Sequence, residues 1–194
     1  MCFSYEISIS TFFFSWAVSI YLLTKNLNKM AQHNIIFLMI FSTMQLIDAI
    51  FWKIDMKKNN INYYLTSYIV PLILSAQIIY SIYFINDNVP LLVQLAAIIV
   101  VFTLFKSYNS TYTIPSDNIF SSPLWGGVHL SKLIMILFFI LIFYGRIGLS
   151  GYNLFNLLGG IVSLFVSFLI SGGTGSIWCS LANILSIIYL VWYG

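Results

Sequence analysis

Residues 34–52 decide the fold, and they read NIIFLMIFSTMQLIDAIFW. The stretch is apolar almost throughout, and polar and apolar positions do not alternate along it. A bilayer core about 30 Å thick needs about 20 such residues per helix. Continuously apolar runs are typical of transmembrane helices, whereas the strands of membrane barrels alternate. We therefore predict that this stretch crosses a membrane as a helix.

Six further apolar runs lie around this one, and together they predict an all-α integral membrane bundle of about seven helices in a single domain. Residues 106–124 are expected to be a loop, because they are rich in Ser, Asn and Thr and hold two prolines. Pro71 predicts a kink or a freed carbonyl in the third helix. A re-entrant segment in place of the fourth or fifth helix is the alternative. The predicted helices are residues 7–23, 34–52, 63–85, 90–105, 127–144, 152–170 and 176–192.

The composition also favours a membrane location. The chain has 194 residues, of which 60% are hydrophobic and 7% are charged. Soluble domains carry about 25% charged residues, and so few charges cannot cover a surface that faces water. The lipid bilayer is therefore the expected surrounding. The formal net charge of +3 is small and scattered, so nucleic acid is not expected as a partner.

Polar side chains within the apolar helices are the candidates for function, because an ionisable group in hydrocarbon is costly unless it is paired or hydrated. Gln45, Asp48 and Trp52 are spaced three and four residues apart, so they share a helical face that should point into the bundle. His129 and Lys132 share a face of the fifth helix. One solution is a buried Asp48–Lys132 ion pair with His129 beside it. In the alternative, His129 and Lys132 lie near the interface and the Lys132 ammonium reaches water.

Other polar or small residues each leave two interpretations open. Glu6 precedes the first helix and either lies in the headgroup region of the membrane or has a role as a capping or site-lining carboxylate. Gln77, within the third helix, is expected to hydrogen-bond across helices, for packing or for a ligand. Asn183 should find a partner inside the bundle, again for packing or as part of a site. A stripe of small residues in the sixth helix predicts close helix packing and a homo-oligomer contact; it comprises Gly159, Ser163 and Ser167.

Several kinds of chemistry are disfavoured. His33 and His129 are the two histidines, and His33 is expected to be solvated beside Lys29, so we expect no metal centre. Cys2 and Cys179 are expected to be unpaired thiols, since they lie far apart in the sequence and do not form a disulfide framework. The sequence contains no phosphate-binding loop, nucleophile elbow or dinucleotide fingerprint. The cofactor, if there is one, is therefore unknown from the sequence.

Short motifs in three parts of the chain resemble a known group of proteins. The chain begins Met1-Cys2-Phe3-Ser4 and continues with Glu6; the second helix carries Gln45, Asp48 and Trp52, and the last helix opens with Trp178 and Cys179. This pattern resembles a family of short multi-pass membrane proteins of unknown function from bacteria, fungi and large DNA viruses. Asp48 stands where the family pattern has Glu. With heavy use of Ile, Asn, Phe, Tyr and Lys, the resemblance implies a viral protein in a host or virion membrane.

An odd number of helices brings the motifs to one membrane face. The starts of helices one, five and seven would lie there, together with the end of helix two. The candidate site residues are Cys2, Glu6, Gln45, Asp48, Trp52, His129, Lys132, Trp178, Cys179 and Asn183, with Trp125 at the start of helix five.

Three functions stay open for this constellation. The first is binding or permeation of a proton, an ion or a small polar ligand. The second is a structural component of a viral or host membrane. The third is an intramembrane enzyme for a lipid or thiol substrate, with Cys2 or Cys179 as the nucleophile or a metal ligand and His129 as the base. No basic cluster flanks either cysteine, which weighs against an enzyme.

Overall fold

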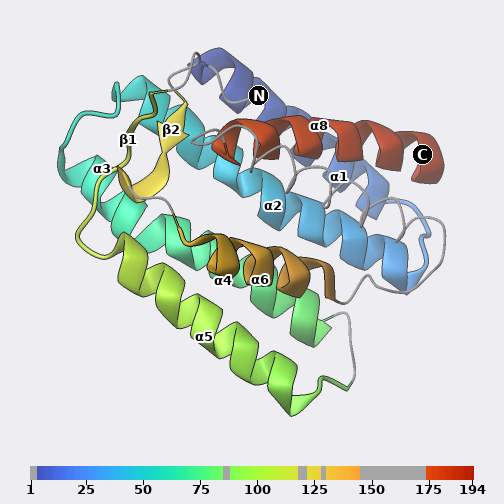
Figure 1. Cartoon of the computed structure of the whole chain (residues 1–194). Helices are drawn as coiled ribbons and strands as arrows, with labels where there is room; N and C mark the ends of the chain where they lie inside the picture. Colours follow the sequence, from blue (N-terminus) through green and yellow to red (C-terminus); the bar gives the residue numbers. More distant parts are fainter. Residues whose placement is uncertain (1–3, 85–87, 118–121, 128–129, 145–173) are drawn as a thin grey trace.

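The computed structural model describes residues 4–84, 88–117, 122–127, 130–144 and 174–194, with only the backbone given for residues 132 and 174–180 (Figure 1). The described chain is all-α apart from one short hairpin, as the sequence predicts. Its helices are α1 Tyr5–Leu23, α2 Lys29–Lys53, α5 Leu91–Tyr108, α6 Lys132–Phe143, α8 Thr174–Tyr193 and a long helix, Asn60–Phe84. The long helix comprises α3 Asn60–Tyr64, the π-helical turn η1 Leu65–Ile69, α4 Val70–Ile79 and a second π-helical turn, η2 Tyr80–Phe84.

Four of the described helices are long and apolar enough to cross a membrane: α1, α2, Asn60–Phe84 and α5. Two shorter apolar helical stretches, Leu133–Phe143 and Leu181–Tyr193, lie within α6 and α8. The predicted sixth helix, residues 152–170, lies outside the described residues together with its small-residue stripe. The structure is therefore consistent with a membrane location, and the count of seven helices stays a prediction.

Capping side chains explain why several helices do not begin where hydropathy predicted. The Asn28 side chain accepts a hydrogen bond from the Ala31 backbone N–H at 2.8 Å, so α2 begins at Lys29, before its apolar stretch. Asn59 caps α3 in the same way. The predicted start of the fifth helix at residue 127 is wrong, because Ser131 caps α6 and that helix begins at Lys132. Caps lie outside the apolar runs, so hydropathy alone does not find them.

Pro71 is accommodated by a wider helical turn. The ring of a proline within a helix clashes with the carbonyl four residues earlier, and proline has no N–H to donate. The turn η1 ends two residues before Pro71, and the Val70 N–H bonds to the Leu65 carbonyl, five residues back. The predicted local irregularity at Pro71 is thus a π-helical turn, and the helix continues to Phe84.

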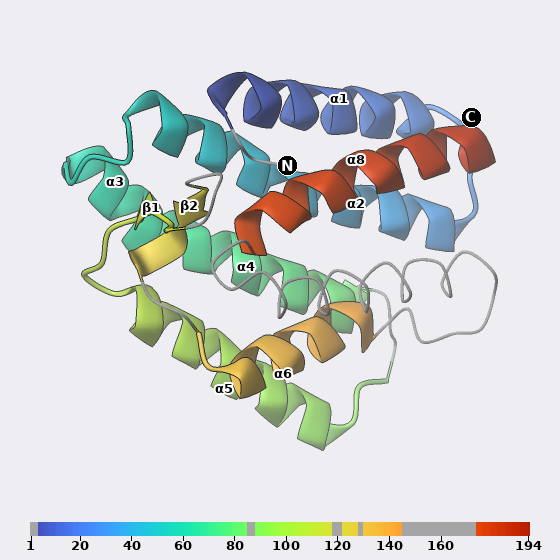
Figure 2. The ribbon, with the colours of Figure 1, turned by 45° about the horizontal axis from the view of Figure 1, so that its top comes forward.

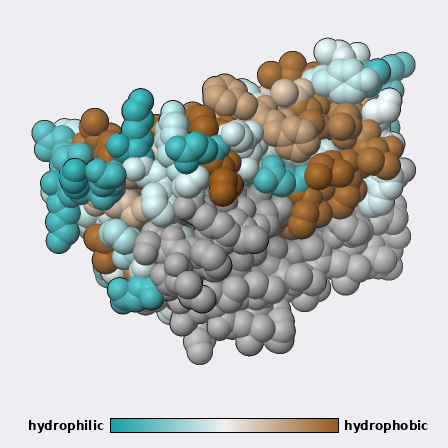
Figure 3. All heavy atoms as spheres, turned by 90° about the horizontal axis from the view of Figure 1, so that it is seen from above, coloured by the Kyte–Doolittle hydropathy of each residue, from teal (hydrophilic) through white to brown (hydrophobic). Residues whose placement is uncertain are grey.

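The helices pack around α2, as Figure 2 shows. On one side of α2 lie α1 and α8; on the other lies α4, which α5 and α6 cover. Large apolar side chains remain on the outside, among them Phe13, Leu92 and Phe102. Figure 3 shows hydrophilic side chains gathered mainly at one end of the visible face and hydrophobic ones toward the other. Such exposed apolar area fits lipid contact better than contact with water.

A small hairpin lies over one end of the bundle. It consists of β1 Ile114–Pro115 and β2 Pro123–Leu124, paired antiparallel with Ile114 opposite Leu124. The segment was predicted to be a loop from residue 106, but α5 continues to Tyr108. The 3₁₀ turn η3 Trp125–Gly127 follows β2, and Gly126 and Gly127 both adopt positive φ angles there. This turn carries the side chain that completes the candidate site.

Candidate functional site

The site is built around Asp48 in the last two turns of α2. Its side chain is 1% exposed, and Asp48 Oδ1 accepts a hydrogen bond from Trp125 Nε1 at 2.8 Å. Trp125 is itself buried, and the strand just before it, β2, contacts both α2 and α8. A carboxyl group in this position depends on its hydrogen bond, because burial of an unpaired polar group is costly.

The conformation of the turn after Trp125 holds the indole in place. Gly126 has a φ of 72°, a value that disfavours a side chain. A Cβ at this position would also meet Cδ1 of the Tyr108 ring at 2.8 Å. The glycine therefore lets the chain turn sharply against α5 and aim Trp125 at Asp48.

Gln45 lies one helical turn before Asp48 on the same face of α2. It is 0% exposed, and neither Nε2 nor Oε1 has a hydrogen-bond partner among the described residues. Each unpaired buried polar group costs about 1–3 kcal/mol, so native proteins rarely keep them without a reason. A full set of unpaired amide atoms beside a buried carboxyl is the feature of this site that most needs an explanation.

The predicted inward face of α2 is confirmed for Gln45 and Asp48 and holds in part for Trp52, which is half-buried against the core. The hydrogen-bond partner that the structure gives Asp48 is Trp125, whereas the sequence suggested Lys132. His129 and the side chain of Lys132 lie outside the described residues, so an Asp48–Lys132 ion pair stays a prediction.

The other predicted site residues separate into different regions. Glu6 is exposed in the first turn of α1, where a carboxylate is favourable beside the helix N-terminus, and the side chain that caps this helix is that of Ser4. Asn183 Nδ2 donates to Thr11 Oγ1 at 3.0 Å, which confirms a partner inside the bundle but places Asn183 between α1 and α8. Cys2 and the side chains of Trp178 and Cys179 lie outside the described part of the chain. The start of α8 does lie beside β2 (Figures 1 and 2).

Two polar residues lie in surroundings that differ from the expected ones. His33 was expected to be solvated, but it is half-buried and its Nδ1 lies 2.9 Å from Tyr80 Oη. The reason is that α2 begins at Lys29, so His33 is already on its second turn. Gln77 was expected to hydrogen-bond across helices, but it is 0% exposed and neither amide atom has a partner within the described structure.

Sequence reasoning missed Asn62, which joins α3 to the loop before β1. Its Nδ2 contacts the carbonyls of Met56, Lys57 and Thr113, and its Oδ1 accepts from the Thr113 N–H and the Thr66 hydroxyl. The distances run from 2.9 to 3.1 Å. A single Asn near a polar loop gives no signal for such a role.

Within the described ranges, no three His, Cys, Asp or Glu side chains gather in a way that could hold a metal ion. Comparison with known proteins found no matching family model, no matching curated protein and no matching solved structure.

Proposed function

We propose that this chain is an integral membrane protein that binds a proton or a small monovalent cation at Asp48 and Gln45, near one membrane face. Four long apolar helices and the apolar side chains on their outer surfaces support the membrane location. The seven-helix count rests on the apolar runs of the sequence, including residues 152–170.

Gln45 is the observation that carries the proposal. Its Oε1 atom is a buried acceptor without a donor in the described residues, and the Asp48 carboxyl lies one turn away. A small cation between the two would give the amide oxygen a partner and balance a negative charge in a medium where a lone charge is costly. Trp125 fixes one carboxyl oxygen, which leaves Asp48 oriented for this role.

A purely structural site would look different. Buried polar side chains that serve packing are hydrogen-bonded by their neighbours, as the buried Asn62 and the half-buried Asn183 are. A structural component of a membrane is the competing function, and measurements of proton flux and of cation-dependent stability separate the two.

The full chain, reconstituted in liposomes that contain a pH-sensitive dye, would be tested for proton flux under an imposed pH gradient. Thermal unfolding in detergent would be compared in sodium, potassium, ammonium and choline chlorides. We expect proton flux above that of protein-free liposomes, or a higher Tm in one of the three small cations than in choline.

Asp48→Asn should abolish whichever signal the wild type shows. Glu6→Gln is the matched control, because it neutralises an exposed carboxylate and should behave as the wild type. If the folded wild type shows no flux and the same Tm in all four salts, the binding function is wrong and the structural function is favoured.

The membrane in question is proposed to be that of a virus or its host, on the resemblance of the Met1-Cys2-Phe3-Ser4 opening and on the composition typical of an A+T-rich genome. Self-association through Gly159, Ser163 and Ser167 is part of the same proposal.

A further inference from the structure

A second group of buried polar side chains lies where the start of α2 meets the end of the long helix. The contact between His33 Nδ1 and Tyr80 Oη, at 2.9 Å, fixes how these two antiparallel helices are aligned. Gln77 lies three residues before Tyr80, so the two share a helical face. Asn34 and Ser81, the next residues along each helix, are both buried.

Gln77 is the member of this group whose polar atoms are unexplained. Its side chain is 0% exposed, and both amide atoms lack hydrogen-bond partners among the residues described. An amide offers donors and an acceptor together, and no fixed charge. The matching ligand is therefore small, neutral and able both to donate and to accept, and water has these properties.

We propose that Gln77, with His33 and Tyr80 beside it, lines a second polar site that holds water. A buried water usually has two to four polar partners, and this cluster of amide, imidazole and phenol groups can provide them. His33 is only half-buried and follows the exposed Lys29, so water reaches the site from the membrane face at which α2 begins.

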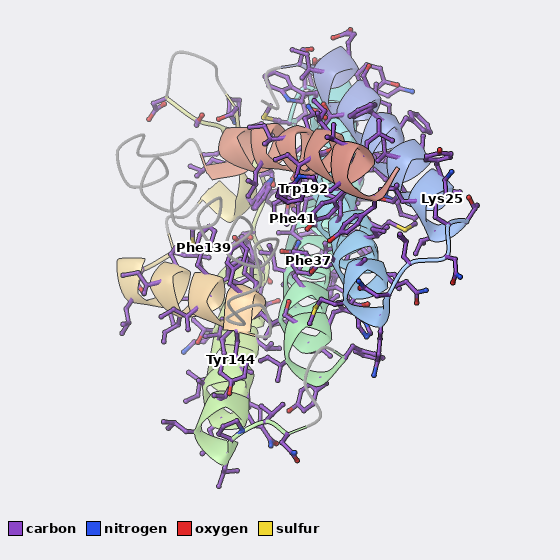
Figure 4. The ribbon with its side chains drawn as sticks, turned by 90° about the vertical axis from the view of Figure 1, so that its right-hand side faces the viewer. Lys25, Phe37, Phe41, Phe139, Tyr144 and Trp192 are labelled. Carbon is purple, nitrogen blue, oxygen red and sulfur yellow. The ribbon has the colours of Figure 1, made fainter. Side chains whose placement is uncertain are left out.

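This site is distinct from the one at Asp48. Fifteen residues separate His33 from Asp48 along α2, which is about 22 Å at 1.5 Å per residue. Leu38 and Phe41 lie between them and are both buried. Phe41 lies in the interior with Phe37, as Figure 4 shows, and their ring centroids are 6.0 Å apart. Large apolar side chains thus lie between the two sites, and the water site does not depend on cation binding at Asp48.

Cysteine alkylation tests whether water reaches Gln77, because the reactive thiolate forms only where water solvates it. Gln77→Cys would be made in a full-length chain that carries Cys2→Ser and Cys179→Ser. Leu74→Cys is the matched control, one turn earlier on the same helix and equally buried among apolar groups. With a small hydrophilic maleimide in liposomes, Gln77→Cys should react at least tenfold faster than Leu74→Cys. Equal rates would overturn the proposal.

A second measurement covers the case in which the cysteine variants do not fold. In a dry site, Gln77→Leu would remove two unpaired polar atoms and should raise Tm. In a hydrated site, the same change removes hydrogen-bond partners of the buried water and should lower Tm. Gln77→Asn retains the amide group and should keep most of the wild-type Tm. A rise in Tm for Gln77→Leu shows that the site is dry and contradicts the proposal.

Discussion

Asn62 and Gln45 are two buried carboxamides in regions with opposite character. Asn62, under the hairpin, uses both of its polar atoms to join α3, the preceding loop and Thr113. Gln45, on the face of α2 that carries Asp48, is just as buried and pairs with none of the described residues. The same chemical group is therefore fully hydrogen-bonded in one region and without a hydrogen bond to the described residues in the other. Hydrogen bonding, rather than burial, separates the two roles.

The largest expected effect is at Asn62. Asn62→Ala should lower the free energy of unfolding by about 3 kcal/mol, because it leaves several buried groups unpaired at once. Chemical unfolding in detergent measures this loss. Asn60→Ala, an exposed neighbour on α3, should change stability by less than about 0.5 kcal/mol. Equal effects at the two positions would remove the basis for treating Asn62 as structural.

The hydrogen bond between Trp125 and Asp48 should have the next largest effect. Trp125→Phe keeps an aromatic ring but removes the donor, and it should cost about 2 kcal/mol of unfolding free energy. A double-mutant cycle with Asp48→Leu isolates the pair. In the Asp48→Leu background, Trp125→Phe should cost clearly less than in the wild type. An unchanged cost would mean that the indole acts through packing alone.

A smaller effect on stability is expected at Gln45, and it should depend on which cation the buffer contains. With a bound cation at about ten times its Kd, the wild type gains about 1.4 kcal/mol over choline buffer. Gln45→Leu should lose this gain, and in choline it should be at least as stable as the wild type, because it removes two unpaired buried polar atoms. Thermal unfolding in the two buffers measures the difference. A Gln45→Leu variant that keeps the full cation-dependent gain would place the ion elsewhere.

The smallest effect is expected between α1 and α8. Ser186 Oγ lies 3.0 Å from Ser15 Oγ, and such pairs between membrane helices contribute about 0.6 kcal/mol. Ser186→Ala should therefore lower the unfolding free energy by about that amount and leave cation binding intact. The Ser15→Ala and Ser186→Ala double variant should be no less stable than the worse single variant. A loss of cation binding in Ser186→Ala would connect this contact to the Asp48 site.

The sequence predicts the elements of the fold better than their contacts. Long apolar runs identify α1, α2, Asn60–Phe84 and α5, because the hydropathy of a segment depends only on its own residues. The spacing of Gln45 and Asp48 correctly predicts their shared, buried face. Helix starts are less predictable: Asn28 caps α2 but lies outside the apolar run by which that helix was recognised.

Partners of the polar groups could not be predicted, because they come from distant parts of the chain. Trp125 is 77 positions from Asp48, and Thr113 is 51 positions from Asn62. Lys132 was an equally reasonable partner for Asp48 on charge alone. The lack of hydrogen bonds from Gln77 to the described residues could not be predicted either, because a sequence shows that an amide is present but not what surrounds it.

The wide turn at Leu65–Ile69 also sets the rotational phase of the long helix. A π-helical turn holds one more residue than an α-helical one, and each residue rotates a helix by about 100°. The turn therefore lets Asn62 and Thr66 face the hairpin at one end while Gln77 and Tyr80 face α2 at the other. Deleting a single residue within Leu65–Ile69 would rotate one of these two sets of side chains by about 100° away from its hydrogen-bond partners. The number of residues in this turn is therefore as important to both regions as the identity of their side chains.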